Sequence, residues 1–141
     1  MKTNALNQPY RVLKVAFGVV PIVAGLDKFT NLLTNWEQYL NPVVAHAVPA
    51  FAFMRVVGVI EIVAGLLVLS KQTRLGAYVV TAWLVGIALN LLSSGHFLDV
   101  AVRDLVMACG AFTLAKLEEA GVARQREGSN ATAPVWRDGH A

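Results

Sequence analysis

The stretch "GVVPIVAGL" at residues 18–26 returns forty residues later as "GVIEIVAGL" at residues 58–66, and seven of the nine letters match. The two copies are apolar apart from their fourth position, where Pro21 stands in the first and Glu61 in the second. Each copy lies inside a longer apolar run, close to the about 20 residues that a helix needs to cross a bilayer. The repeat therefore predicts two helices in a membrane.

The whole chain supports this class. Its 141 residues are 56% hydrophobic and only 15% charged, whereas about a quarter of residues are charged in soluble proteins. Apolar runs predict four spans at about 12–29, 51–70, 75–92 and 97–116, hence an all-α, integral membrane four-helix bundle within residues 1–117. A soluble bundle is the alternative, but the runs "AYVVTAWLVGIALNLL" and "VVGVIEIVAGLLVLS" show no continuous polar face.

Basic residues predict the orientation of the bundle. Nine of the twelve flank one side of the predicted spans, and only Lys28, Arg55 and Arg103 lie on or near the other. By the positive-inside rule we expect a bacterial inner-membrane protein with both termini in the cytoplasm. The pI near 9.3 then reflects topology, and no nucleic-acid partner is expected.

Two segments outside the spans carry local signals. In the connection at residues 30–50, Thr34 and Glu37 have the spacing of a capping box, and Pro42 and Pro49 are expected to interrupt a helix. We expect a short helix on the outer surface, with Trp36 and Tyr39 at headgroup level, and a plain loop is the alternative. Residues 118–141 are polar and rich in Gly and Ala, which predicts a disordered cytoplasmic tail.

The repeat also predicts how the first two spans meet. In the first copy Gly18, Pro21 and Gly25 fall on one stripe, and in the second Gly58 and Gly65 fall on the matching stripe. Small residues let helices in lipid approach closely, so both stripes are interpreted as packing surfaces. Duplication and chance within an apolar alphabet both remain open as the origin of the match.

Glu61 is an ionisable residue inside a span, where a charge is costly and usually has a partner. Counting about 1.5 Å per residue places Arg103 at a similar depth, so we expect the two to be coupled, directly or through Asn90 or a water. The cluster is either a structural tie between helices or a polar pocket that opens outward and holds a small molecule, a quinone head group or a proton. Its candidate residues are Asp27, Lys28, Glu61, Asn90, His96, Asp99, Arg103 and Asp104.

With these residues in view, the chain resembles the DoxX-like family of small four-span bacterial membrane proteins. The resemblance covers residues 11–117 and is carried by "GLDKF", "GVIEIVAGLLVL", "RLGAYVV" and "VRDLVMACGAFTLA". It implies association with membrane oxidoreductase assemblies, including a thiosulfate:quinone oxidoreductase, but locates no catalytic residue.

The sequence does not favour redox chemistry by the chain alone. Cys109 is its single cysteine, so one chain cannot form a dithiol centre, and its histidines lack metal-ligand spacing. A haem between His46 and His96 is the weak alternative, and no cofactor is expected. We therefore predict a non-catalytic subunit or quinone-facing anchor for a redox partner. The alternative is a small-molecule binding or transport protein, and a homo-oligomer fits either function.

Overall fold

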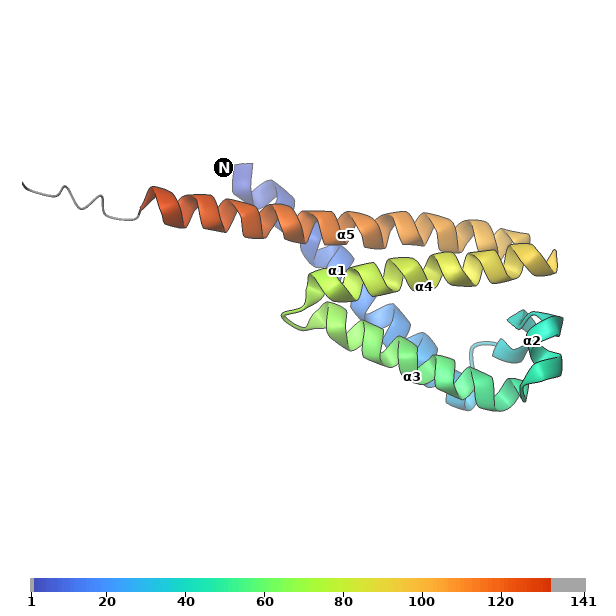
Figure 1. Ribbon diagram of the computed structural model, residues 1–141. Helices are drawn as coiled ribbons and strands as arrows, with labels where there is room; N and C mark the ends of the chain where they lie inside the picture. Colours follow the sequence, from blue (N-terminus) through green and yellow to red (C-terminus); the bar gives the residue numbers. More distant parts are fainter. Residues whose placement is uncertain (1, 133–141) are drawn as a thin grey trace, which may run out of the picture.

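The computed structural model describes residues 2–132, which form helices and no strand. Four long helices run in alternating directions and make the predicted all-α membrane bundle (Figure 1). They are α1 (Lys2–Thr30), α3 (Ala50–Leu69), α4 (Thr73–Ser94) and α5 (Leu98–Ala131). Two short helices, the 3-10 helix η1 (Trp36–Tyr39) and α2 (Pro42–Ala47), connect α1 to α3. We call the end that carries them the η1 end, and the opposite end, where α1 begins, the terminal end.

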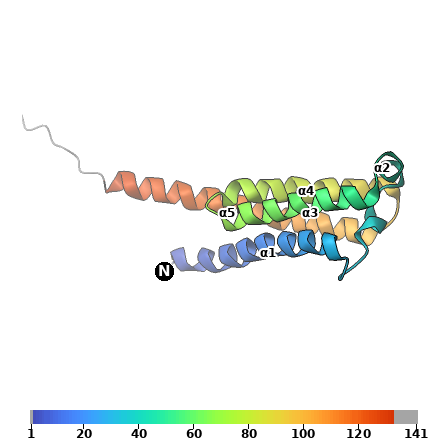
Figure 2. The same ribbon diagram turned by 90° about the horizontal axis from the view of Figure 1, so that it is seen from below.

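The bundle consists of two closely packed helix pairs. Helix α1 packs mainly on α3, and α4 packs mainly on α5, while fewer contacts join α3 to α4 and α1 to α5. Figure 2 shows the long helices running along one direction, with α2 at one end of the bundle. The buried apolar cluster that spans the pairs includes Val68 of α3, Val80 of α4 and Leu114 of α5. A short turn between Leu69 and Thr73 holds α3 beside α4.

The outer surface of the bundle is apolar along the helices. Val59 and Val63 of α3 are each 51% exposed, and Val102 and Val106 of α5 are 59% and 67% exposed. Helices α3 and α4 are long and apolar enough to cross a bilayer, with mean hydropathies of 2.3 and 1.9. Side chains of this kind are stable on the outside when the surrounding solvent is lipid.

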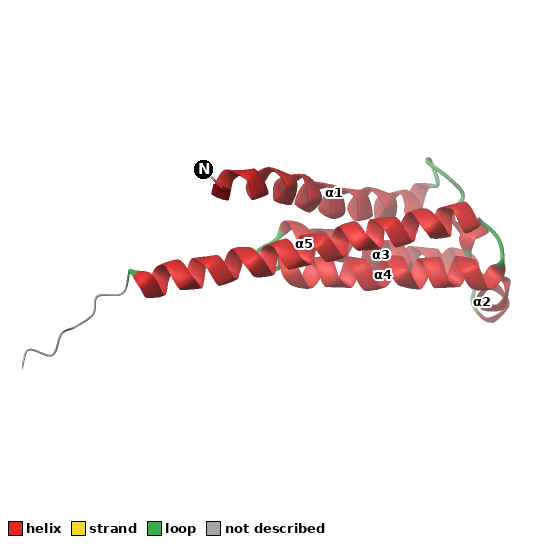
Figure 3. Cartoon of the chain, turned by 90° about the horizontal axis from the view of Figure 1, so that it is seen from above, coloured by secondary structure: helices red, strands yellow, loops and turns green. Residues whose placement is uncertain are grey.

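Helix α5 continues as a helix to Ala131, well beyond the bundle, where the sequence predicted a disordered tail from residue 118 (Figure 3). The extension is rich in Ala, Glu, Arg and Gln, which favour helix, and the preceding span supplies a nucleus from which it can propagate. The remainder of the predicted tail, residues 133–141, lies outside the described residues.

The connection between α1 and α3 also differs in detail from the prediction. The N-cap of η1 is Asn35, whose side chain accepts a hydrogen bond from the Glu37 amide, so Thr34 does not form the predicted capping box. The helical elements break before both prolines, as expected: η1 ends at Tyr39, before Pro42, and α2 ends at Ala47, before Pro49. Pro42 itself stands in the first turn of α2, where its missing amide is not needed.

Candidate functional site

The two copies of the repeat pack directly against each other in opposite directions. A Cβ on Gly25 would lie 2.5 Å from the carbonyl oxygen of Gly58, and a Cβ on Gly58 would lie 2.7 Å from that of Gly25. At the other end of the contact, Gly65 meets the carbonyl oxygen of Gly18. The packing role predicted for these glycines is thus found in the structure, and Pro21 lies on the same stretch of α1 between Gly18 and Gly25.

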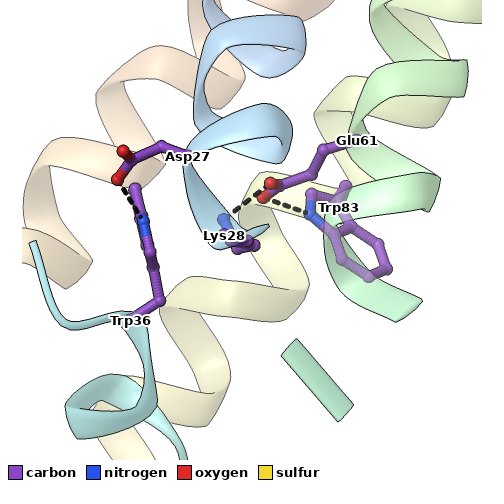
Figure 4. Close-up of polar contacts among 5 residues, drawn as sticks. All are labelled: Asp27, Lys28, Trp36, Glu61 and Trp83. Carbon is purple, nitrogen blue, oxygen red and sulfur yellow. Dashed lines mark hydrogen bonds and ion pairs between the residues drawn. The ribbon is translucent and has the colours of Figure 1, made fainter. Parts of the chain in front are cut away.

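A buried ion pair lies beside this contact. Lys28 Nζ of α1 donates to Glu61 Oε2 of α3 at 2.6 Å, and the two residues are only 6% and 7% exposed (Figure 4). Side chains on a helix lean toward its N-terminus, so in antiparallel helices these two lean toward each other and meet near the level of Gly25 and Gly58. The glycines bring the backbones close enough for the two side chains to meet.

Two tryptophans complete the surroundings of the ion pair. Trp83 of α4 donates from Nε1 to Glu61 Oε1 at 3.3 Å. The ring of Trp36 lies across Lys28, with the Nζ atom 3.7 Å from the ring centroid, a distance suited to a cation–π contact. The sequence analysis placed Trp36 at the headgroup level and assigned no role to Trp83. The indole NH group of a buried tryptophan usually donates a hydrogen bond, and this property could have indicated that the two tryptophans contact the polar site.

Asp27 lies next to the pair but serves the chain reversal after α1. Its carboxylate accepts hydrogen bonds from Trp36 Nε1 at 2.7 Å and from the amide of Leu32 at 2.9 Å, as well as from Leu33 and Thr30. Asn31 takes up the left-handed conformation, with φ of 52°, at this turn. Asp27 therefore holds η1 beside the ion pair, and Trp36 contacts both Asp27 and Lys28 (Figure 4).

The direct form of the predicted coupling between Glu61 and Arg103 is wrong, because Glu61 pairs with Lys28 and Arg103 is exposed. Depth along α5 was estimated from sequence, but depth does not determine which face of the helix turns inward. The inward-facing residue is the next one, Asp104, which is 7% exposed.

The remaining candidates lie near the η1 end and do not join the ion pair. Asn90 of α4 donates to the backbone oxygen of Tyr39 at 3.1 Å, and the ring of Tyr39 packs edge-on against Phe97 with centroids 4.7 Å apart. These contacts fasten η1 to the second helix pair. His96 and Asp99 are exposed at the start of α5.

A second polar cluster, at the terminal end, centres on Glu119. Its carboxylate accepts hydrogen bonds from Lys116 at 2.9 Å and from the Tyr78 hydroxyl at 2.8 Å, and Arg74 lies 3.1 Å away. The hydrogen bonds from Lys116 and Tyr78 hold the pKa of Glu119 below its ordinary value. Beside this cluster, α1 and the α5 extension border a groove of about 460 Å³ that includes Leu6.

In chemical terms, the site at the η1 end holds two opposite charges, those of Lys28 and Glu61, in a fixed arrangement inside an apolar bundle. Three of the long helices contribute to it through Lys28, Glu61 and Trp83, and Asp104 of α5 is also buried. Among residues 2–132 there is no group of three His, Cys, Asp or Glu side chains that could hold a metal ion. Cys109 is exposed on α5.

The family comparison matches residues 6–129 of this chain, which include most of α1, the whole of α3 and α4, and almost all of α5. The matching family is described as methylamine utilisation protein MauE and consists of membrane proteins; it is not the DoxX-like family that the sequence resembles. No curated protein and no solved structure matches the chain. The chain belongs to the MauE family of membrane proteins.

Proposed function

We propose that this chain is a non-catalytic membrane subunit that supports a redox partner in methylamine utilisation. The family match carries the proposal, because it extends over almost all of the four-helix bundle and the family is named for methylamine utilisation. Breakdown of an amine by oxidation releases electrons that a further protein must accept. The resemblance to DoxX-like proteins supports the same role, since that family is associated with membrane oxidoreductase assemblies.

In this proposal the η1 end is the side that faces the partner or a quinone. Leu32, Leu33 and Val43 are 84%, 69% and 77% exposed there, which offers an apolar surface on a connection fixed from both sides. Trp36 ties the connection to α1 and Asn90 ties its other end to α4. The buried ion pair would serve by holding this surface in one conformation, so that less ordering is required when the partner binds.

For localisation we propose the bacterial inner membrane with both termini in the cytoplasm. The distribution of basic residues supports this orientation, and α1 begins at the same end of the bundle from which the α5 extension projects (Figure 1). The η1 end would then face away from the cytoplasm.

Growth and co-purification test the proposal in the source organism. A strain that lacks this chain is expected to lose growth on methylamine and to grow normally on ammonium with another carbon source. A tagged chain, extracted in mild detergent from methylamine-grown cells, is expected to carry an oxidoreductase or an electron carrier. Unimpaired growth of the deletion strain on methylamine would contradict this function.

The second candidate is a small-molecule binding or transport protein, and the convergence of polar side chains from three of the long helices favours it. Purified protein would then be stabilised against heat by methylammonium or by a short-chain quinone. Lys28→Gln should abolish that stabilisation, whereas Arg55→Gln, which changes an exposed cation outside the ion pair, should leave it unchanged.

A further inference from the structure

Arg103 is a cation on the outward-facing side of α5, among apolar side chains. It follows Leu98, the first residue of the helix, by five positions, or about 8 Å along the helix axis. Its exposed neighbours on the same helix include Val102 and Val106. Ionisable residues within membrane spans usually face the interior of a bundle and are paired. Among residues 2–132, however, no carboxylate forms an ion pair with Arg103, so this cation is free to pair with an anion from another molecule.

Arg55, which is exposed near the η1 end of α3, shows how the chain can cover such a cation by itself. The guanidinium carbon of Arg55 lies 4.0 Å from the centroid of the Phe51 ring and 5.9 Å from that of Phe29. These distances are suited to cation–π contacts. Within the described part of the chain, no aromatic ring takes up Arg103 in this way.

A residue of opposite charge lies one helical turn away from Arg103. Asp99 is exposed on α5, and no ion pair joins it to a cation within residues 2–132. Beside these two charges, the exposed residues Val102, Val106 and Cys109 recur at intervals of four and three positions, which is the spacing of a helix-to-helix contact. One face of α5 thus carries an acid, a base and a strip of apolar side chains, so it is complementary to a second copy of itself.

The levels of the two charges in the membrane agree with such a contact. Two copies inserted in the same orientation have parallel α5 helices, with each residue at the level of its counterpart. Asp99 then lies about 6 Å above Arg103 of the other copy along the helix axis. Long side chains on a helix lean toward its N-terminus, so the guanidinium of Arg103 leans toward the level of Asp99. A two-fold axis forms this contact twice, which favours the pair of copies over a single one.

We propose that this face of α5 binds a second copy of the chain and makes a parallel homodimer. Arg103 of each copy pairs with Asp99 of the other, Val102 and Val106 pack along the contact, and the two Cys109 side chains lie close to the two-fold axis. The inference concerns a surface other than the connection between α1 and α3, and it does not depend on the proposed redox partner.

Cys109 allows the dimer to be tested in the unaltered chain, because it is the only cysteine of the sequence. Oxidation with copper phenanthroline in lipid vesicles is expected to give a disulfide-linked dimer on a non-reducing gel. In a Cys109→Ala background, Val106→Cys should be crosslinked as well, whereas Val59→Cys, at an exposed position of α3, should not. Light scattering of the wild-type protein in detergent should give the mass of two chains.

Charge reversal tests the pairing itself. Arg103→Asp and Asp99→Arg should each lower the association constant, measured from the crosslinked fraction on dilution with lipid, by about tenfold or more, because each places like charges opposite each other. The two changes combined should restore association, and Arg55→Asp is the control that should leave it unchanged. Thermal unfolding shows whether each variant is folded.

Three results would overturn the proposal. The first is a wild-type chain with the mass of a single copy and no crosslink at Cys109, as expected if Arg103 contacts only lipid phosphates. The second is a crosslinked fraction that Val59→Cys matches, which would indicate random collision. The third is a combined variant that is folded but does not recover association. If the single variants do not fold, the mass and the Cys109 crosslink of the wild-type chain still decide the question.

Discussion

Gly25 and Gly58 bring the backbones of α1 and α3 into contact, each glycine facing the carbonyl oxygen of the other. The contact relates the two copies of the repeated sequence, since Gly65 also faces the carbonyl oxygen of Gly18 farther along the helices, while Gly18 faces the side chain of Leu69. Because both helices carry the same glycine-containing surface, the two copies fit together when the helices run in opposite directions. The ion pair of Lys28 and Glu61 depends on this close approach.

Gly25→Ala should therefore destabilise the bundle, by about 1–3 kcal/mol as is typical of overpacking, because the new methyl group meets backbone that cannot move aside. Gly86→Ala is the matched control, since a Cβ at Gly86 in α4 meets nothing within 4 Å. It should be neutral or stabilising by up to about 1 kcal/mol through helix propensity. Unfolding of both variants in detergent checks the prediction, and equal effects would contradict the close approach of α1 and α3.

Two substitutions of Trp36 should show how much each of its two contacts, with Asp27 and with Lys28, contributes to stability. Trp36→Phe keeps an aromatic face over Lys28 but removes the hydrogen bond to Asp27, with an expected loss of about 1 kcal/mol. Trp36→Leu removes both contacts and should cost roughly another 0.5–2 kcal/mol. Thermal unfolding measures both losses, and a Leu variant as stable as the Phe variant would show that the ring does not act on Lys28.

The sequence predicted the all-α membrane class and the stripe of glycines on which α1 meets α3, because hydrophobic runs and glycine spacing are local signals. It did not predict the partner of Glu61. Lys28 was assigned to the end of its span, and only the tilt of side chains on antiparallel helices brings it to Glu61. The sequence also did not predict which face of α5 is buried, and with it the burial of Asp104, because that face is determined by packing on α4.

Acid should weaken the cluster around Glu119. Its pKa is lowered in the folded state by hydrogen bonds from Lys116 and Tyr78, so the stabilisation is present above the pKa of the unfolded chain. It is lost as the pH falls through the lowered folded-state value. Glu119→Gln should be slightly less stable than wild type at neutral pH and equally stable in strong acid. A stability difference that does not change with pH would contradict this role.

The proposed topology predicts which positions an impermeant thiol reagent reaches in intact cells. After replacement of Cys109, cysteines at Asn35 and Ser94 should be labelled, because η1 and the end of α4 lie at the end of the bundle that faces outward. A cysteine at Ser129, on the α5 extension, should be labelled only after the membrane is opened. The reverse pattern would contradict the orientation.

A double-mutant cycle on Lys28 and Glu61 tests most directly whether a buried ion pair holds α1 to α3. Lys28→Gln and Glu61→Gln are each expected to cost about 3–5 kcal/mol in detergent unfolding, because each leaves one buried charge without its partner. The double variant should lose much less than the sum of the two. The parallel cycle of Glu61→Gln with Arg103→Gln should be nearly additive, because Arg103 is exposed. An interaction energy near zero for Lys28 and Glu61, or a larger one for Glu61 and Arg103, would contradict the site described here.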